Sequence, residues 1–166
     1  FYTYLMHLKN KGIVDGYEDG NFYPNNTITR EEFIKLLISV AGFELTETKG
    51  DFDDVAESDW YAPYVYTAKK LNIVNGMDDG SFGAGNAVSR QDMSVMIYKV
   101  ITMKKDVGTS KDKFTDDNSI SEYAKTAVYS MKTLGVLNGY EDGTFKPSGN
   151  LTRAEAVKVI SLILNI

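Results

Sequence analysis

The chain has no cysteine, and its 166 residues include a single histidine, His7. The lack of cysteine excludes disulfides, thiolate metal sites and cysteine nucleophiles, although it does not fix the compartment. Any Ser-His-Asp triad or imidazole metal site would have to use His7. In the repeat alignment below, His7 corresponds to Thr67 and Ser130. We therefore expect His7 on a solvated face, without a catalytic role.

Several other signals are lacking. No apolar run approaches the roughly 18 residues that span a bilayer. The start of the chain has none of the features of a signal peptide, which indicates a mature protein or a fragment of a longer one. The formal net charge of -5 disfavours a general affinity for nucleic acid. No Gly-Lys-Ser/Thr phosphate loop and no pair of carboxylates typical of a glycosidase stands out. We expect no enzyme activity, cofactor, bound metal or membrane partner.

What the chain does contain is one unit repeated three times. The pentapeptide GYEDG at 16–20 recurs as GMDDG at 76–80 and as GYEDG at 139–143. In each copy a phenylalanine lies six residues after the first glycine. An arginine lies fourteen residues after the same glycine, and a hydroxyl residue directly precedes it. The equivalent residues are Phe22, Phe82 and Phe145, then Thr29-Arg30, Ser89-Arg90 and Thr152-Arg153. Because these spacings are the same in all three copies, they indicate a repeat architecture.

An amphipathic helix is predicted after each arginine. Apolar residues recur three, six, seven, ten and eleven positions later, which is the stripe of a half-buried helix. The hydroxyl residue is its expected N-cap. The acid three residues on completes a capping box, only approximately in the case of Asp92. These acids are Glu32, Asp92 and Glu155.

A second helix is predicted before each glycine loop, over 60–71 and 121–134, with that of the first copy starting at Phe1. Pro63 fits the first turn of such a helix, and Ser58 or Asp59 is the expected cap. Left-handed C-caps are expected at Gly12, Asn72 and Gly135.

The helix–loop–helix repeats are predicted to pack together. The expected units are 1–44, 45–104 and 105–166, and each is too small to build much core alone. The connections contain Phe52 and Phe114 at matching places, so part of each is expected to pack. We expect an all-α domain, with the three units packed together about a pseudo-threefold axis.

The glycine loop has the composition of a calcium loop, but its ligand positions do not fit. With Asp19 and Gly20 at positions 5 and 6, Asp15 falls at position 1 and Tyr17 at position 3. The second copy has Met77 at that third position. A tight turn with a positive φ at the glycine is the preferred interpretation, with the three phenylalanines packed into the core behind it. Calcium binding stays the weaker alternative.

Helix stability does not explain the arginine that starts each helix. A cation at that position opposes the helix dipole, at a cost of about 0.3–1 kcal/mol. Its guanidinium adds a fork of donors to a helix N-terminus that already attracts anions. We therefore expect Arg30, Arg90 and Arg153 to bind a carboxylate or phosphate. The alternative is that each pairs with an acid of the neighbouring unit.

An aromatic residue begins the second and third copies of the other helix. Trp60, the single tryptophan, corresponds to Tyr123, and the equivalent of the first copy would precede Phe1. Such a residue is either part of the core or a flat platform for a sugar ring. The sequence leaves both interpretations open.

The complete pattern resembles the S-layer homology domain, in three tandem copies that cover nearly the whole chain. The first copy, GYEDGNFYPNNTITREEF, and the third, GYEDGTFKPSGNLTRAEA, match best. The second, GMDDGSFGAGNAVSRQDM, departs at Met77, Ala84, Ser89 and Asp92. The length of the motif and its recurrence in register make the resemblance specific.

The resemblance implies a secreted, non-catalytic anchor that holds surface proteins on the bacterial cell wall. Triplets of this family form a three-pronged pseudo-trimer around a central helical bundle. They bind secondary cell-wall polysaccharide, often ending in pyruvylated N-acetylmannosamine, in grooves between the prongs. By this resemblance the ligand contacts are the arginines Arg30, Arg90 and Arg153, the aromatics Trp60 and Tyr123, and backbone amides near Gly16, Gly76 and Gly139.

Two departures limit what is carried over. With no residue before Phe1, one groove lacks its aromatic, and the divergent second copy weakens another. Other S-layer or surface protein subunits are further expected partners, through parts outside this chain. The main alternative is a structural or protein-interaction module whose grooves stay empty or pair with another chain.

Overall fold

The computed structural model describes residues 2–47, 49–50, 52–164 and 166. Within these residues the helices are α1 (Tyr2–Asn10), α2 (Arg30–Ala41), α3 (Ala62–Lys70), α4 (Arg90–Thr102), the 3-10 helix η1 (Asp117–Ser119), α5 (Glu122–Thr133) and α6 (Arg153–Ile163). The described residues form isolated β-bridges but no β-strand. The predicted all-α class is therefore confirmed. No described helix is long and apolar enough to cross a membrane.

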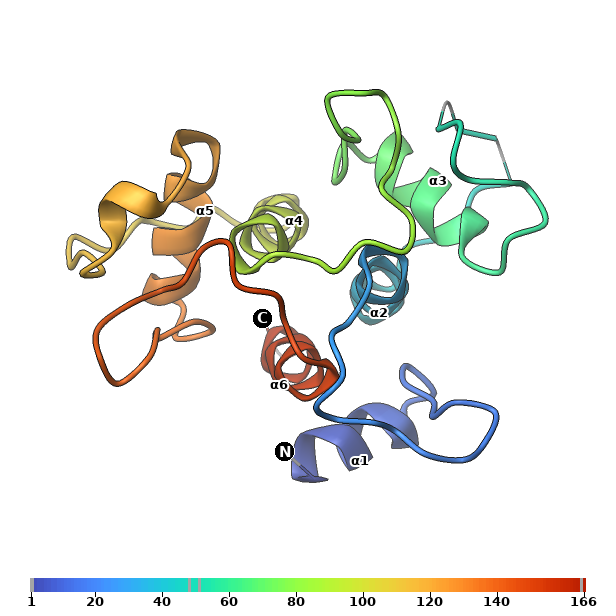
Figure 1. Cartoon of the computed structure of the whole chain (residues 1–166), viewed down its shortest axis with the longest axis horizontal. Helices are drawn as coiled ribbons and strands as arrows, with labels where there is room; N and C mark the ends of the chain where they lie inside the picture. Colours follow the sequence, from blue (N-terminus) through green and yellow to red (C-terminus); the bar gives the residue numbers. More distant parts are fainter. Residues whose placement is uncertain (1, 48, 51, 165) are drawn as a thin grey trace.

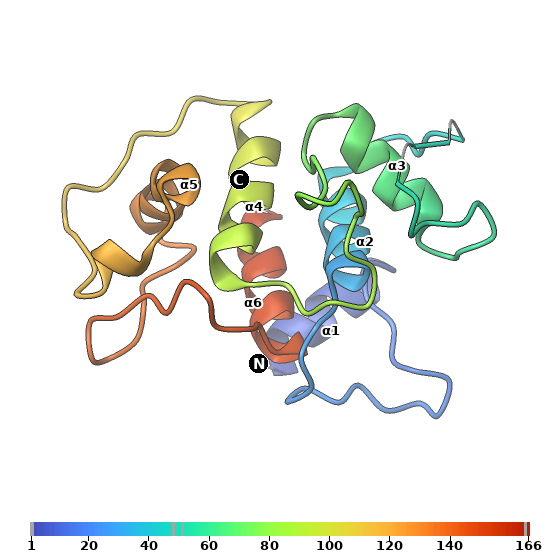
Figure 2. The same ribbon diagram turned by 45° about the horizontal axis from the view of Figure 1, so that its top comes forward.

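Three inner helices are surrounded by three outer ones. Figure 1 shows α2, α4 and α6 nearly end-on at the centre, with α1, α3 and α5 outside them. Figure 2 shows the inner helices from a tilted direction, running side by side. Each outer helix packs on the inner helix of the preceding repeat, α3 on α2 and α5 on α4, while α1 packs on α6. Each repeat therefore packs its outer helix on its neighbour, and the three contacts close a cycle.

A ring of backbone hydrogen bonds joins the repeats just before the inner helices. The Ile28 N–H donates to the Leu151 carbonyl, the Leu151 N–H to Val88, and the Val88 N–H to Ile28, at N···O distances of 3.0, 3.2 and 3.2 Å. All three side chains are buried. Because each residue both donates to one repeat and accepts from the other, the ring fixes the relative register of all three inner helices.

The inner helices begin as predicted. The hydroxyls of Thr29 and Thr152 accept the N–H of Glu32 and Glu155, and both glutamates accept the N–H of their cap residue in return. In the second copy the Ser89 hydroxyl accepts the Asp92 N–H but also donates to the Asp92 carboxylate. Aspartate is one methylene shorter than glutamate, and there it bonds the cap hydroxyl instead of the cap amide. The approximate box predicted for this copy is thus half formed.

The predicted start of the outer helix α3 differs from the structure. The predicted caps Ser58 and Asp59 are wrong: α3 begins after Tyr61, which makes no side-chain cap bond. The Asp59 carboxylate instead accepts the Ala56 N–H, at 2.8 Å, in the turn before the helix. The left-handed C-caps are confirmed, with φ of 67, 57 and 69° at Gly12, Asn72 and Gly135.

The predicted solvated face for His7 is also wrong. His7 Nδ1 lies 3.3 Å from the Ser161 hydroxyl of α6, in a partly buried contact. Its equivalents Thr67 and Ser130 are buried. The reason is this packing between repeats, which turns this face of each outer helix toward the inner helix of the preceding repeat.

The linkers pack as expected, and their phenylalanines sit behind the glycine loops. The rings of Phe52 and Phe82 are 5.7 Å apart, and those of Phe114 and Phe145 are 5.3 Å apart. Phe82 and Phe145 are fully buried, whereas Phe22 is only partly buried. The predicted core position therefore holds completely in the second and third copies.

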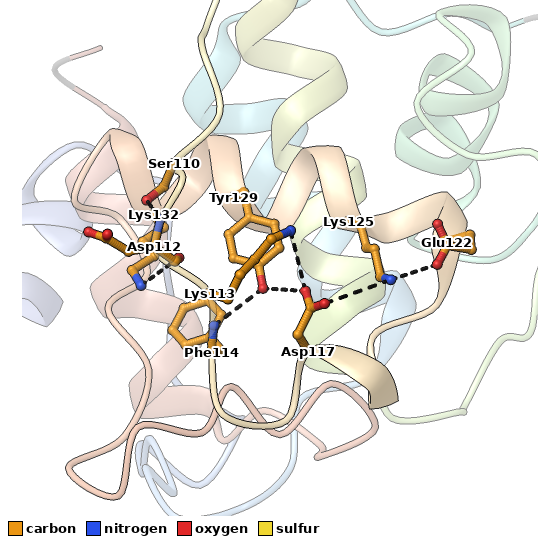
Figure 3. A network of polar contacts seen from close by, with 9 residues as sticks. All are labelled: Ser110, Asp112, Lys113, Phe114, Asp117, Glu122, Lys125, Tyr129 and Lys132. Carbon is orange, nitrogen blue, oxygen red and sulfur yellow. Dashed lines mark hydrogen bonds and ion pairs between the residues drawn. The ribbon is translucent and has the colours of Figure 1, made fainter.

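The second linker is fastened by a polar network around Tyr129, shown in Figure 3. The Tyr129 hydroxyl donates to Asp117 and accepts the Phe114 N–H. Lys113 and Lys125 lie 3.6 and 3.9 Å from the Asp117 carboxylate. Burial, followed by the bond to Asp117, raises the pKa of Tyr129 to about 12. In the first linker the equivalent Tyr66 makes a simpler bond, to the Val55 carbonyl.

Candidate functional site

Two grooves open between the repeats, and each is built from all three of them. Groove 1 has a volume of about 490 Å³ and runs between the first glycine loop and α2. Arg153 of α6 lies on one side of it, and Trp60, just before α3, on another. Gly16 and Tyr17 contribute from the glycine loop itself. The predicted residues Arg153, Gly16 and Trp60 thus line one surface.

Groove 2 repeats this plan one step further around the cycle. It has a volume of about 390 Å³ and lies between the second glycine loop and α4. Its lining includes Arg30, Gly76 and Tyr123. In both grooves the arginine comes from the preceding repeat in the cycle and the aromatic from the following one.

The remaining predicted residues, Arg90 and Gly139, meet at the third equivalent place. The Arg90 guanidinium lies 4.7 Å from the centre of the ring of Tyr140, the residue after Gly139. The aromatic of this place would again precede Phe1.

Each arginine is held by the next repeat in the cycle. Its Nε donates to the carbonyl of the loop phenylalanine, over whose ring the guanidinium also lies. The N···O distances are 3.0 Å for Arg30 to Phe82, 2.8 Å for Arg90 to Phe145 and 3.0 Å for Arg153 to Phe22. The distances to the ring centres are 5.3, 5.1 and 4.7 Å in the same order.

The same arginines pair with the capping acids of the next repeat. Nη1 lies 2.8 Å from Glu32 for Arg153, 3.6 Å from Glu155 for Arg90 and 3.8 Å from Asp92 for Arg30. The arginines are only 6–7% exposed. Burial lowers the pKa of Arg30, and the charge of Asp92 acts in the opposite direction. Of the two alternatives given by the sequence, pairing with an acid of the neighbouring unit is what the structure contains. The atoms that take part in these contacts are Nε and Nη1.

The two aromatics are not part of the core. Trp60 is 58% and Tyr123 62% exposed. The Tyr123 hydroxyl donates to Asp92 at 2.7 Å, which ties it to the acid that faces Arg30. Trp60 packs edge-on against Tyr61, with ring centres 5.3 Å apart. The core interpretation is therefore wrong, and a platform for a sugar ring stays a prediction.

Tyr17 is a groove residue that the sequence analysis did not propose. Its hydroxyl donates to Glu32 at 3.0 Å, and its ring centre lies 4.4 Å from the Arg153 guanidinium carbon. Burial, followed by the hydrogen bond to Glu32, raises its pKa. Tyr140 takes the same position in the third copy, whereas groove 2 has Met77 there. The available signal was the aromatic residue inside the repeated motif.

The motif glycines are required by close packing. A Cβ on Gly76 or Gly139 would lie 2.6 Å from the ring of Phe52 or Phe114, and both residues have a positive φ, of 96 and 76°. A Cβ on Gly16 would lie 2.9 Å from the Asn21 carbonyl oxygen. The following amides donate across the loop, at 2.7–2.8 Å, and are not free for a ligand; they belong to Tyr17, Met77 and Tyr140. Donation from the glycines themselves stays a prediction.

The predicted tight turns are present. Gly20, Gly80 and Gly143 have φ of 80, 85 and 79°. In each turn the preceding aspartate accepts the N–H two residues on, as Asp19 does from Asn21 at 2.9 Å. The carboxylates are therefore occupied by the turn itself, which accounts for the Asp-Gly pair without a metal.

Each of the two linkers contains an aspartate, not proposed from the sequence, that binds the backbone of one loop. Asp54 accepts the N–H groups of Phe82, Gly83 and Ala84 at 2.7, 2.8 and 2.9 Å. Asp116 similarly accepts those of Phe145 and Lys146, both at 2.8 Å. The available signal was the shared pattern Phe-x-Asp in the two linkers, at 52–54 and 114–116.

Replacing Asp54 with asparagine is expected to destabilise the protein at neutral pH but not in strong acid. Burial alone would raise the pKa of Asp54, but the three N–H groups outweigh it and hold the pKa below its ordinary value of 3.8. The charged form therefore stabilises the fold above pH 3.8, and this contribution is lost as the pH falls through the lower, folded pKa. Unfolding by urea, measured for both proteins from pH 7 downward, should give a difference that disappears below 3.8. A constant difference would contradict the assignment.

The comparisons with known proteins point to one family. The model of the S-layer homology domain family matches residues 1–34, 51–94 and 113–157. An amylopullulanase of Thermoanaerobacterium thermosulfurigenes is 33% identical over 156 residues, which are 92% of this chain and 8% of that protein. The exoglucanase XynX of Acetivibrio thermocellus is also 33% identical, over 92% of this chain and 14% of its own length. A cellulosome-anchoring protein of the same species is 28% identical over 90% of this chain and 34% of its own length.

The chain thus spans about a third or less of each of these three relatives. The shared part is therefore one module within each of these longer relatives. Because the three matched segments together cover most of the chain, in register with its repeats, the chain belongs to the S-layer homology domain family.

Proposed function

We propose that the chain anchors a surface protein non-covalently to the bacterial cell wall by binding wall polysaccharide in grooves 1 and 2. Membership of the family indicates a location at the cell surface. The observation that carries the proposal is the convergence of an exposed aromatic, an arginine and a glycine loop from three repeats in each groove. Open grooves with flat aromatic rims and a few polar groups suit sugar rings.

The relatives support an anchor and not a catalyst. Two of them carry the names of glycoside-degrading enzymes, yet the chain matches only a small part of each. A third is named for anchoring the cellulosome. A module shared by proteins with such different names is best suited to their common need, which is attachment to the wall. The cargo would then lie in parts outside this chain.

The ligand that we propose is a secondary cell-wall polysaccharide with a pyruvylated N-acetylmannosamine terminus. Its ketal carries one carboxylate, which suits a donor fork at a helix N-terminus. In each groove arginine Nε donates to the neighbouring repeat and Nη1 faces one of its carboxylates. The arginine therefore shapes the groove and offers the ligand the edge that remains.

Trp60→Ala is expected to weaken retention on purified wall polysaccharide by at least about tenfold, as for an aromatic hot spot. The residue is exposed, so the fold should be unaffected. Trp60→Phe should restore part of the binding. Tyr2→Ala removes another exposed aromatic, 71% exposed and outside both grooves, as the matched control.

The same measurement is made after chemical removal of the pyruvate. Equal retention before and after would mean that the grooves do not recognise the carboxylate. Unchanged retention of a Trp60→Ala/Tyr123→Ala double variant would contradict the proposed function and favour the alternative of a structural or protein-interaction module.

A further inference from the structure

The two grooves differ in how their cations are occupied. In groove 1, Lys35 donates to the Ile13 carbonyl at 3.1 Å and lies 4.0 Å from Asp15, while Arg153 is paired with Glu32. In groove 2, Arg30 is bonded to Phe82 and faces Asp92. Among the described residues, the side chain of Lys99 makes no hydrogen bond or ion pair. It is the one groove-lining cation there without a partner.

Lys99 is placed to face the groove. Asp92, Val95, Met96 and Lys99 all line groove 2 and are spaced as one face of α4. At a rise of about 1.5 Å per residue, Lys99 lies two turns, or roughly 10 Å, from Asp92 along the helix. It therefore provides a positive charge well separated from the Arg30–Asp92 pair.

The ammonium of Lys99 is partly removed from water without compensation. Its side chain is half-buried. Burial lowers its pKa, and no nearby carboxylate opposes this effect. The other titratable groups of the groove are Asp78, Asp92, Arg30 and Tyr123. An anion brought into the groove would restore the missing interaction.

The balance of charge separates the grooves further. Groove 1 is lined by four carboxylates and two cations, whereas groove 2 has two of each. The residues equivalent to Lys99 in the first and third copies are Ser39 and Leu162. A free cation is thus particular to groove 2, while the single tryptophan is particular to groove 1.

We propose that the grooves divide the ligand between them: groove 2 binds the carboxylate of an acidic sugar through Lys99, and groove 1 binds uncharged sugar rings on Trp60. This inference rests on the proposed function and assigns the anionic group to one groove. Arg30, held by the neighbouring repeat, positions the loop and offers the carboxylate only its remaining edge, while Lys99 supplies the unpaired charge.

Each groove contains its own reporter, which makes the inference testable. Met77 lines groove 2 and Trp60 lines groove 1. The probes are the pyruvyl ketal of N-acetylmannosamine, neutral N-acetylmannosamine and N-acetylmannosamine 6-phosphate. Methyl NMR of Met77 and fluorescence of Trp60 then follow each groove separately during titration.

Lys99→Met should weaken binding of the ketal, read at Met77, by at least about tenfold, because a charge-assisted contact is lost. Lys99→Arg should stay within about threefold of the wild type, since the charge is kept. Lys70→Met removes an exposed lysine outside both grooves and should change nothing. Because Lys99 has no partner among the described residues, Lys99→Met should unfold at the same urea concentration as the wild type.

The outcomes separate this inference from the proposed function. A ketal response at Met77 that is equal in wild type and Lys99→Met overturns the inference, and so does a ketal response at Trp60 alone; sugar binding would stand in both cases. Tighter binding of the phosphate than of the ketal would overturn the carboxylate assignment. No response of either reporter to any probe, and no retention on the polysaccharide, would overturn both proposals.

Discussion

Arg153→Ala is expected to lower the free energy of unfolding by about 3 kcal/mol, the cost of removing one partner of a largely buried ion pair. Arg153 Nη1 lies 2.8 Å from Glu32, and its Nε donates to the Phe22 carbonyl. Both partners belong to the first repeat, so the substitution loosens the contact that closes the cycle. Urea unfolding, which leaves ionic strength unchanged, measures the effect.

The three arginines should rank by how well their pairs are formed. The distances of Arg90 and Arg30 to their acids are longer, at 3.6 and 3.8 Å, and those acid side chains are 36 and 32% exposed, against 18% for Glu32. Alanine at Arg90 or Arg30 should therefore cost less than alanine at Arg153. A double-mutant cycle with Glu32→Gln isolates the pair. Equal losses at all three sites would instead identify stacking on the phenylalanine as the main contribution.

Loss of wall binding in an arginine variant has two possible causes. All three arginines of the chain stand at this one position of the motif, and each is bonded to the next repeat. An alanine variant that no longer binds the wall could have lost either a ligand contact or the shape of its groove. Cleaner tests come from Trp60, which is exposed, and from Lys99, whose side chain has no hydrogen bond or ion pair among the described residues.

Gly76→Ala is expected to cost about 3 kcal/mol or more, adding backbone strain of roughly 1–3 kcal/mol to overpacking of roughly 1–3 kcal/mol. Its φ is 96°, and the new Cβ would lie 2.6 Å from the Phe52 ring and 2.8 Å from the Ser81 carbonyl oxygen. Backbone cannot move aside as a flexible side chain does. Groove 2, which Gly76 lines, should lose its shape as well.

The chain offers two matched controls for this substitution. Gly85 has a φ of 79° but nothing within 4 Å of a new Cβ, so Gly85→Ala isolates the strain. Gly108 also has open space, and its φ lies outside the left-handed region, so Gly108→Ala should be close to neutral. Thermal unfolding of the three variants measures the series. A Gly76→Ala protein no less stable than Gly85→Ala would contradict the close approach of Phe52.

Features that depend on a few neighbouring residues were predictable. The caps at Thr29 and Thr152, the left-handed residue at Asn72 and the Asp19-Gly20 turn all satisfy backbone groups within four residues in sequence. Prediction failed for His7 because its partner lies on α6, more than 150 residues away. The missed cap at Asp59 has a local cause, since its carboxylate accepts the N–H of Ala56 in the preceding turn.

The sequence by itself determined that this protein is three helical repeats of the S-layer homology family, because repetition and periodicity are properties of the chain alone. Only the tertiary structure decided that each outer helix packs on the preceding repeat, and that the arginines are tied to the capping acids of the next one. Bonds such as that from Arg153 to Phe22 join residues 131 positions apart. Their partners are chosen by how the helices fill space together, and no local pattern encodes that choice.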